Sequence, residues 1–411
     1  MNFAESGRTL RIPCSLMRGG TSRGLVFRRE DLPDDPELRD AIFLAAIGSP
    51  DVRQIDGVGA GDSHTSKVAV VHPASDGQAD LDYLFGEVGI TEARVDYAGN
   101  SGNIISALGL YAVEEGIVAA KAPETLVRVR NLNTGKLIEL SVPVNDGHPA
   151  EEGDFSIDGV PGYGPRIDMV LRDPGGSLTG KLLPTGRMVD ELDVSGLGRV
   201  RASLVDASNP AAFVAGADLG LTPERAVASL NQDEPLLARL QAVRAAASVA
   251  MGLVGQAQDA WAYSPMVPFV VIVFPPATYA RFDDPSVQVQ AGEVDLCARV
   301  ISLAKVHKSI NVTVGAALTA AALLPDTVVH GMLDKSAAAG TSEVEKSLRI
   351  GHPSGVLHTF GKLESSQEGY SVPYVRLGRT ARRIFQGEIL IQPYKLRYAR
   401  ERLRAAGVRA R

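Results

Sequence analysis

Two segments rich in small residues, one in each half of the chain, most constrain how this sequence can fold. The first is "GNSGNIISALG", residues 99–109, and the second is "VGAALTAAAL", residues 314–323. Each follows polar residues at the end of a predicted strand. A helix with small residues on every face is typical of one that is closely enclosed on all sides. We therefore expect each half to be a sheet wrapped around a central helix.

The order of predicted elements repeats along the chain, with the second round starting near Gly196. We interpret the repeat as an internal structural duplication with little sequence identity between halves. Two unrelated α+β domains remain the alternative. A chain of 411 residues is also longer than the roughly 250–300 residues at which single cores stop growing. We expect two domains, 1–192 and 193–411, with the last strands able to pack back on the first.

The composition of the chain argues against some classes of binding partner. The net charge of −6 and the aromatic content of 5% argue against a nucleic-acid or anionic-membrane partner. No apolar run approaches the ~20 residues of a membrane span, and the N-terminus lacks a signal-peptide core. We therefore expect a cytoplasmic protein. The two cysteines, Cys14 and Cys297, offer neither a disulfide scaffold nor metal-ligand spacing, so we expect no metal.

A glycine-rich turn lies in "MRGGTSRG", residues 17–24. Gly19 permits close approach of the backbone to a ligand. Thr21 and Ser22 could form an anion-binding nest, and Arg18 could clamp a carboxylate. The simpler interpretation is a hairpin turn.

A second glycine-rich loop, "GVGAGDSHTSKVAVV", leads into a strand at Lys67. The lysine stands at the boundary between polar and apolar residues. Desolvation lowers a lysine pKa and would make it a usable base. The alternative is an ordinary surface lysine. The polar residues before it are Ser63, His64, Thr65 and Ser66.

Three further polar turns are candidates for substrate binding. At the first predicted central helix, Asn100 and Ser101 could cap the helix while the N–H groups of Gly102 and Asn103 face an anion. In the second half, Asn209 precedes a proline in a fixed turn. The loop "GHPSG" presents His352 and Ser354, although a loop histidine is more often structural.

Taken together, these motifs resemble those of the PrpF-like isomerases, relatives of diaminopimelate epimerase. "MRGGTSRG", "GDSHTSK", "DYAGNSGN", "SNP", "GHPSG" and "RTARRIFQGEI" occur in the expected order across nearly the whole chain. The resemblance implies an α+β fold of two similar epimerase-like domains, each a mostly antiparallel sheet around a central helix. It also places the active site in the cleft between the domains.

The implied activity is a cofactor-independent 1,3-allylic proton shift, by C=C migration or tautomerisation, on a small unsaturated polycarboxylate. The resemblance implies that Lys67 is the base. We favour 4-oxalomesaconate, an acid of aromatic and lignin catabolism, with methylaconitate or methylitaconate as the alternative. The groups expected to hold substrate carboxylates are Arg18, Gly19, Thr21, Ser22, Ser63, His64, Thr65, Ser66, Asn100, Gly102, Asn103, Asn209, His352 and Ser354.

The sequence departs from the family pattern at Ser101, where relatives often have a cysteine. A thiol is a far better acid or base than a serine hydroxyl near neutral pH. Either Lys67 transfers the proton alone, or Ser101 replaces a cysteine and weakens catalysis. A two-thiol epimerase lacks its thiols here. A weakened tricarboxylate-binding protein and a scaffold protein remain as alternatives, and a homodimer is one expectation for the assembly.

Overall fold

The computed structural model describes residues 8–333, 345–367 and 369–407. The chain divides into two compact units, each described by itself below. Of the described residues, unit 1 contains 8–133, 140–153 and 379–407, and unit 2 contains 134–139 and 154–378. The residues from Arg379 onward therefore return to unit 1, while the domain boundary at 192/193 stays a prediction.

The sheet of unit 1 starts from a hairpin and grows by alternating parallel and antiparallel neighbours. β1 and β2 pair antiparallel, β2 and β3 parallel, β3 and β4 antiparallel, and β4 and β6 parallel. β1 also pairs antiparallel with β23, near the end of the chain. The strands are β1 (Leu10–Gly19), β2 (Ser22–Arg28), β3 (Lys67–Pro73), β4 (Leu81–Val88), β5 (Val95–Asp96), β6 (Glu124–Asn131), β8 (His148–Pro149) and β23 (Ala381–Ile391).

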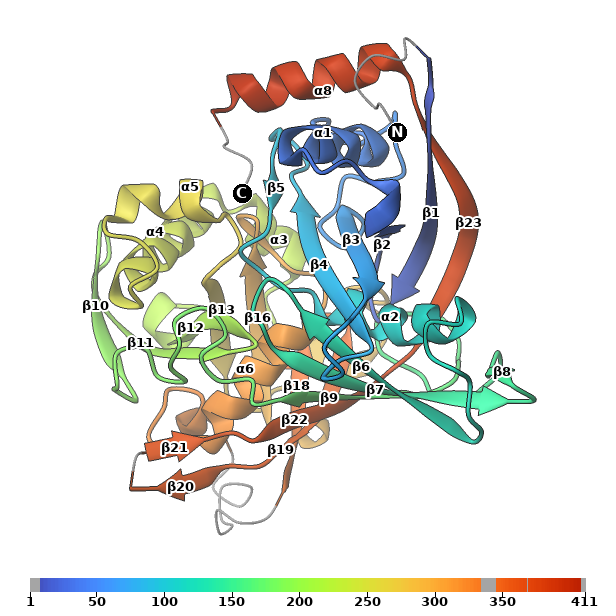
Figure 1. The fold of residues 1–411 in the computed structure, drawn as a ribbon. Helices are drawn as coiled ribbons and strands as arrows, with labels where there is room; N and C mark the ends of the chain where they lie inside the picture. Colours follow the sequence, from blue (N-terminus) through green and yellow to red (C-terminus); the bar gives the residue numbers. More distant parts are fainter. Residues whose placement is uncertain (1–7, 334–344, 368, 408–411) are drawn as a thin grey trace. The chain divides into compact units, whose positions relative to one another are not determined.

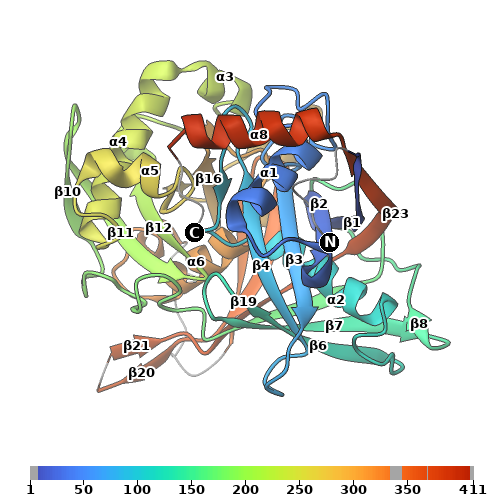
Figure 2. The same cartoon turned by 45° about the horizontal axis from the view of Figure 1, so that its top comes forward.

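Three α-helices belong to unit 1: α1 (Pro36–Ile47), α2 (Gly102–Glu114) and α8 (Pro393–Ala405). The carboxylate of Asp35 caps α1, and Gly48 ends it in the left-handed conformation, with φ 89°. α8, formed by the basic C-terminal segment, lies along α1 with its outer face exposed (Figures 1 and 2).

Unit 2 repeats the same order of pairings. β11 and β12 form an antiparallel hairpin, β12 pairs parallel with β13, β13 antiparallel with β16, and β16 parallel with β18. These elements are β11 (Gly198–Ala207), β12 (Asn209–Ala215), β13 (Phe269–Phe274), β16 (Leu296–Ser302), β18 (Lys346–His352) and β19 (Gly355–Gly361), with helices α4 (Glu234–Ala250) and α6 (Val312–Leu323) between them in the chain.

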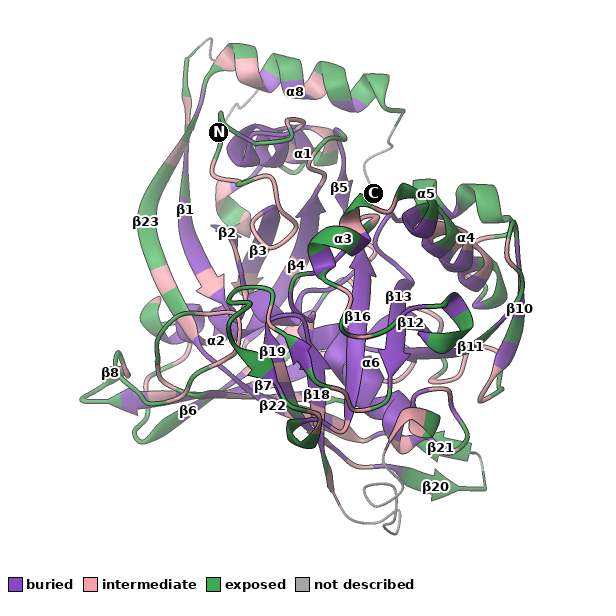
Figure 3. Ribbon diagram, turned by 180° about the vertical axis from the view of Figure 1, so that it is seen from behind, coloured by how far each residue is buried: buried purple, intermediate pink, exposed green. Residues whose placement is uncertain are grey.

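The matching helices α2 and α6 are the two small-residue segments predicted to be enclosed, and each is buried along nearly its whole length (Figure 3). Small residues are needed there for steric reasons. A Cβ added to Gly109 of α2 would lie 2.9 Å from Cδ1 of Leu140. A Cβ added to Gly315 of α6 would lie 2.6 Å from Cδ2 of Leu357. α6 begins two residues earlier than predicted, at Val312.

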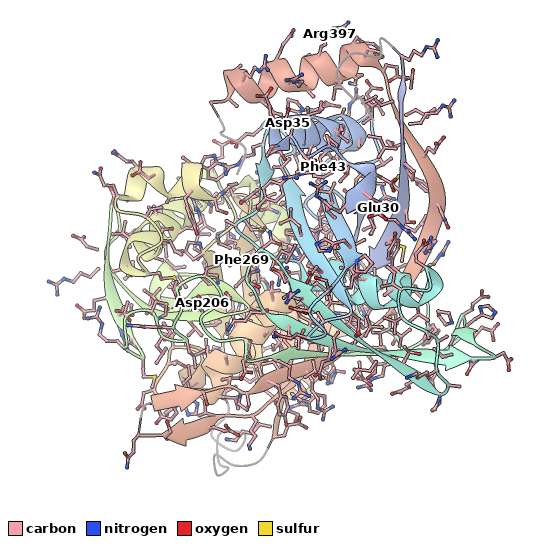
Figure 4. All side chains as sticks on the ribbon, viewed as in Figure 1. Glu30, Asp35, Phe43, Asp206, Phe269 and Arg397 are labelled. Atoms are coloured by element: carbon pink, nitrogen blue, oxygen red, sulfur yellow. The ribbon has the colours of Figure 1, made fainter. Side chains whose placement is uncertain are left out.

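Each unit has its own apolar core. Phe27 and Phe43 pack at 5.5 Å between ring centroids in unit 1, and Phe269 is fully buried in unit 2 (Figure 4). Across the described residues, every helix is too short or too polar to span a membrane. The other elements are β7 (Leu137–Asn145), β9 (Ile167–Arg172), β10 (Asp190–Val194), β14 (Tyr279–Ala280), β15 (Gln288–Val289), β17 (Lys305–Val306), β20 (Glu364–Ser366), β21 (Gly369–Ser371), β22 (Tyr374–Arg379), α3 (Val227–Gln232) and α5 (Ala260–Tyr263).

Candidate functional site

In unit 1 the β1–β2 turn is joined to the first turn of α2. A Cβ at Gly19 would lie 2.0 Å from the carbonyl oxygen of Asn103, so only glycine allows this approach. Gly20 has φ 49°, and a Cβ added to it would lie similarly close to the side-chain amide of Asn103. Nδ2 of Asn103 donates to Oγ1 of Thr21 at 3.0 Å and to Oγ of Ser22 at 3.4 Å. The turn thus holds two hydroxyls at the N-terminus of α2.

Ser101 is the N-cap residue of α2 and is 7% exposed. Among the described residues its hydroxyl makes no capping hydrogen bond, so the expected side-chain cap is wrong. Oδ1 of Asn100 accepts from Asn131 at 3.1 Å and from the Tyr83 hydroxyl at 3.4 Å. The first-turn N–H groups of α2 therefore do not depend on the Ser101 hydroxyl.

Two arginines accompany this turn. Nη1 of Arg18 donates to Oγ1 and the carbonyl oxygen of Thr380 at 2.8 and 2.7 Å. Burial and the nearby charge of Arg382 lower the pKa of Arg18. Arg379, which the sequence analysis did not select, has its Cδ 3.2 Å from where a Gly20 Cβ would stand. Burial lowers the pKa of Arg379 to about 10. The motif "RTARRIFQGEI" was the signal that could have found it.

Lys67 begins β3 and lies directly opposite Glu87 on β4. The two side chains form an ion pair and are almost wholly enclosed, at 4% and 2% exposed for the residues. Nζ of Lys67 also lies 5.5 Å from the centre of the Phe85 ring. The expected burial of Lys67 is observed, whereas its carboxylate partner was not predicted.

Glu87 is a strongly perturbed acid. Burial raises its pKa to about 7, an effect opposed by the Lys67 charge and reinforced by Asp96. Oε1 of Glu87 is buried and has no hydrogen-bond partner in the described part of the chain. Burial likewise raises the pKa of Tyr83, which lies four residues before Glu87 on β4. Lys67, the candidate base, is therefore paired with a buried carboxyl group, that of Glu87.

The loop before Lys67 is organised by Asp62. Nδ1 of His64 lies 2.6 Å from Oδ1 of Asp62, whose carbonyl oxygen accepts from the hydroxyls of Thr65 and Ser66 at 3.0 and 2.8 Å. Ser63 is half-buried in the same turn. These hydroxyls shape the loop.

The same loop is tied to the β1–β2 hairpin. The backbone N–H of Arg23 donates to the carbonyl oxygen of His64 at 2.8 Å, and Gly24 pairs with Lys67 across β2 and β3. Ser22, which contacts the α2 N-terminus, immediately precedes Arg23. Lys67, the glycine-rich turn and the start of α2 are therefore connected within unit 1 and form one candidate site.

Unit 2 builds a matching arrangement. Asn209 begins β12, is fully buried, and follows Ser208, which has φ 69°. Its Nδ2 donates to Oγ1 of Thr313 at 2.8 Å, in the first turn of α6. In both units a hairpin turn is hydrogen-bonded to the second residue of the enclosed helix.

His352 and Ser354 lie at the same end of α6. Nδ1 of His352 accepts from the Ser354 N–H at 3.2 Å, which places the hydrogen of a neutral ring on Nε2. Oγ of Ser354 donates to the carbonyl oxygen of Lys308, four residues before α6. The sequence analysis missed a second such turn, in which Nδ1 of His307 accepts from Ser309 at 3.1 Å. The repeated His-X-Ser pattern could have revealed it.

The cysteines lie in strands rather than in these turns: Cys14 in β1 and Cys297 in β16. Burial raises the pKa of Cys14 to about 11 and also raises that of Cys297. Within residues 8–333, 345–367 and 369–407, no three His, Cys, Asp or Glu side chains are grouped to hold a metal ion.

Comparison with known proteins identifies relatives over nearly the full length. The family model described as PrpF protein matches residues 9–392. The 3-methylitaconate isomerase of Eubacterium barkeri is 39% identical, with 94% of this chain and 99% of the relative covered. The 2-methyl-aconitate isomerase of Shewanella oneidensis is 35% identical, with 93% and 97% covered. The 4-oxalomesaconate tautomerase of Pseudomonas putida is 36% identical, with 93% and 96% covered.

Solved structures of related proteins also resemble this chain. A crystal structure of methylitaconate-delta-isomerase has a TM-score of 0.73 at 38% identity, with 95% of this chain and 97% of that chain covered. A hydroxyproline epimerase from Agrobacterium vitis has a TM-score of 0.53 at 14% identity, with 95% and 94% covered. The second likeness shows the fold alone: a mixed α/β fold similar to that of the proline racemase and hydroxyproline epimerase structures.

Proposed function

Because this chain belongs to the PrpF family of isomerases, we propose that it moves a C=C bond of a small unsaturated polycarboxylate by a 1,3-allylic proton shift, with Lys67 as the base. The observation that carries the proposal is the burial of Lys67 beside a turn that is itself bonded to the N-terminus of α2. A lysine amine in a dry site can accept a proton from carbon, which a hydrated ammonium cannot do.

The proposed reaction conserves all atoms. Lys67 Nζ takes the allylic proton, the C–H bond breaks, and its electrons form a dienolate with the substrate carboxylate. The same proton, or one exchanged with solvent, returns from Nζ to the carbon two atoms away. The double bond moves by one position, with no net oxidation. Stabilisation of the dienolate is assigned to the N–H groups at the start of α2, where the helix dipole favours negative charge.

Each polar turn is proposed, within its own unit, as a candidate carboxylate-binding group. In unit 1 the groups are Thr21, Ser22 and Asn103, supported by the buried guanidinium of Arg379. A buried arginine beside a glycine turn suits bidentate carboxylate recognition. In unit 2 the groups are Asn209, and His352 through Nε2.

The choice of acid is proposed from the relatives. The 39% identity to a 3-methylitaconate isomerase slightly exceeds the 36% identity to a 4-oxalomesaconate tautomerase. We therefore propose 3-methylitaconate as the first candidate, and 2-methylaconitate, whose named isomerase is 35% identical, ranks with 4-oxalomesaconate after it. 4-Oxalomesaconate, favoured by the sequence motifs, is a second candidate because that relative covers the chain equally well.

The test is to incubate the protein with each of the three acids in deuterated water and follow them by proton NMR. We expect the allylic proton of one acid to exchange as its isomer appears. Silence with all three acids, both for the natural protein and for Ser101→Cys, would remove the isomerase mechanism proposed here. Calorimetric binding without exchange would instead indicate a tricarboxylate-binding protein.

A further inference from the structure

We propose that Glu87 is the positioning residue that makes Lys67 a base: its carboxyl takes the proton that Lys67 would otherwise carry, so that Lys67 meets the substrate as a neutral amine. The inference rests on the proposed role of Lys67 as the base. It assigns a function to a deeply buried acid of unit 1, 2% exposed, which the mechanism above does not use.

Lys67 cannot act as a base while it is the charged partner of the ion pair with Glu87. An ammonium group has three donors and no acceptor, so Lys67 cannot remove a proton while it is charged. Its Nζ donates to Oε2 of Glu87 inside the fold. Separated charges are costly in such a medium, and moving one proton along this hydrogen bond turns the ion pair into a neutral amine and a neutral carboxylic acid.

The surroundings of Glu87 favour its neutral form. Asp96 of β5 pairs with it across the strands, and Asp62 of the preceding loop adds a second negative charge. Tyr83 on β4 is fully buried on the same side. The charge of Lys67 opposes them. An ionised carboxylate has about four acceptor sites to satisfy, yet Oε1 of Glu87 has no hydrogen-bond partner among the described residues.

Lys67 and Glu87 together carry the same number of protons before and after each turnover. In the resting pair the Lys67 proton passes to Oε2 of Glu87, leaving Lys67 as an amine. The amine takes the allylic proton and becomes an ammonium, then gives a proton back to the substrate two carbons away. Glu87 keeps its proton throughout, and the pair neither gains nor loses a proton in net over one cycle, while the hydrogens on Nζ can still exchange with solvent before one is returned.

The test is the pH dependence of kcat in Glu87→Gln. For the natural protein we expect kcat to fall below about pH 7, where the pair binds a second proton, and to be nearly flat above it, where the two forms of the pair contain the same number of protons. In Glu87→Gln the amide cannot accept the proton, so Lys67 must release it to water. The logarithm of kcat should then rise by about one per pH unit until the lysine is neutral.

Two further variants serve as controls for this test. Glu87→Asp retains the acid and should restore the natural profile at a lower kcat, which a purely structural role would not predict. Glu364→Gln breaks a matched but exposed pair, Lys362–Glu364 at 2.8 Å, and should leave the profile unchanged. Its circular dichroism and unfolding midpoint also set the reference for folding.

The outcomes separate this inference from the proposed function. If the natural protein is active and Glu87→Gln keeps its profile, Glu87 does not hold the proton. If Glu87→Gln does not fold, the natural profile for Glu87→Asp with one still rising above about pH 7 for Glu87→Ala supports the inference, and the same slope for both overturns it. If the natural protein exchanges no proton with any of the three acids, the proposed function fails.

Discussion

Asn209 donates from Nδ2 to Oγ1 of Thr313 over 2.8 Å, and this bond joins the β11–β12 turn to the first turn of α6. The corresponding bond in unit 1 runs from Asn103 of α2 to Thr21 of the β1–β2 turn. Donor and acceptor are exchanged between hairpin and helix, yet both bonds involve the second residue of an enclosed helix. Each places polar side chains where the helix offers N–H groups to an anion.

Replacing Thr313 tests how far this bond stabilises unit 2. Thr313→Val keeps the shape and removes the acceptor of a buried amide, so we expect unfolding free energy to fall by about 1–3 kcal/mol. Urea denaturation measures the change. Thr222→Val, at an exposed position, is the control and should alter stability by less than about 0.5 kcal/mol. Equal effects of the two substitutions would show that the bond contributes nothing special.

Gly19→Ala tests the close contact between the glycine turn and α2. The added Cβ would stand 2.0 Å from a backbone oxygen, which cannot rotate away, so the hairpin must move from Asn103. We expect a loss of about 1–3 kcal/mol in stability from overpacking and a higher KM. Gly255→Ala, where a Cβ meets nothing within 4 Å, should change neither quantity. An unchanged KM for Gly19→Ala would argue against carboxylate binding at this turn.

Ser101→Cys tests whether the position at the start of α2 takes part in proton transfer. A thiol at a helix N-terminus has a lowered pKa and is a better acid and base than a hydroxyl. We expect the rate of proton exchange to rise by roughly tenfold or more, and Ser101→Ala to lower it by less than tenfold. Steady-state kcat for the three proteins decides this. A large loss in Ser101→Ala would mean that the serine itself transfers the proton.

Asp40 gives the fold a predictable pH dependence. Burial raises its pKa to about 6, despite a hydrogen bond from Tyr97 and the charge of Arg39. The folded protein therefore binds this proton more tightly than the unfolded chain, whose Asp pKa is about 3.9. Stability is lost as pH rises between these values, by about 2–3 kcal/mol in all.

Asp40→Asn removes this titration. We expect the variant to gain about 2–3 kcal/mol relative to the natural protein between pH 4 and pH 7. Urea unfolding at both values measures it. The same difference in stability at both pH values would contradict the assignment.

Much of the fold could be predicted because its strongest signals are local. Small residues on every face specify an enclosed helix, and the segments at α2 and α6 are enclosed. Gly19 and Gly20 were expected to allow a close approach to a ligand, which stays a prediction, and what the backbone approaches there in the structure is Asn103 of α2. The repeated order of elements was expected, whereas the sheets, expected to be mostly antiparallel, combine parallel and antiparallel pairs in both units.

The pairing of Lys67 with Glu87 could not be predicted, because it depends on strand register. The loop between β3 and β4 is long enough to allow several registers, and a shift of one residue would turn Glu87 to the other face of the sheet. Arg379 was missed for a related reason: it lies 360 residues beyond Gly19 in sequence and reaches the turn only through the return of the chain to unit 1.

The most direct test of the central claim is deuterium incorporation into 3-methylitaconate, 2-methylaconitate and 4-oxalomesaconate by the natural protein and by Lys67→Met. Lys362→Met, which removes a partly exposed lysine, is the control. We predict exchange with at least one acid for the natural protein and the control, and a loss of about 100-fold or more for Lys67→Met. Full exchange by a folded Lys67→Met protein would contradict the account.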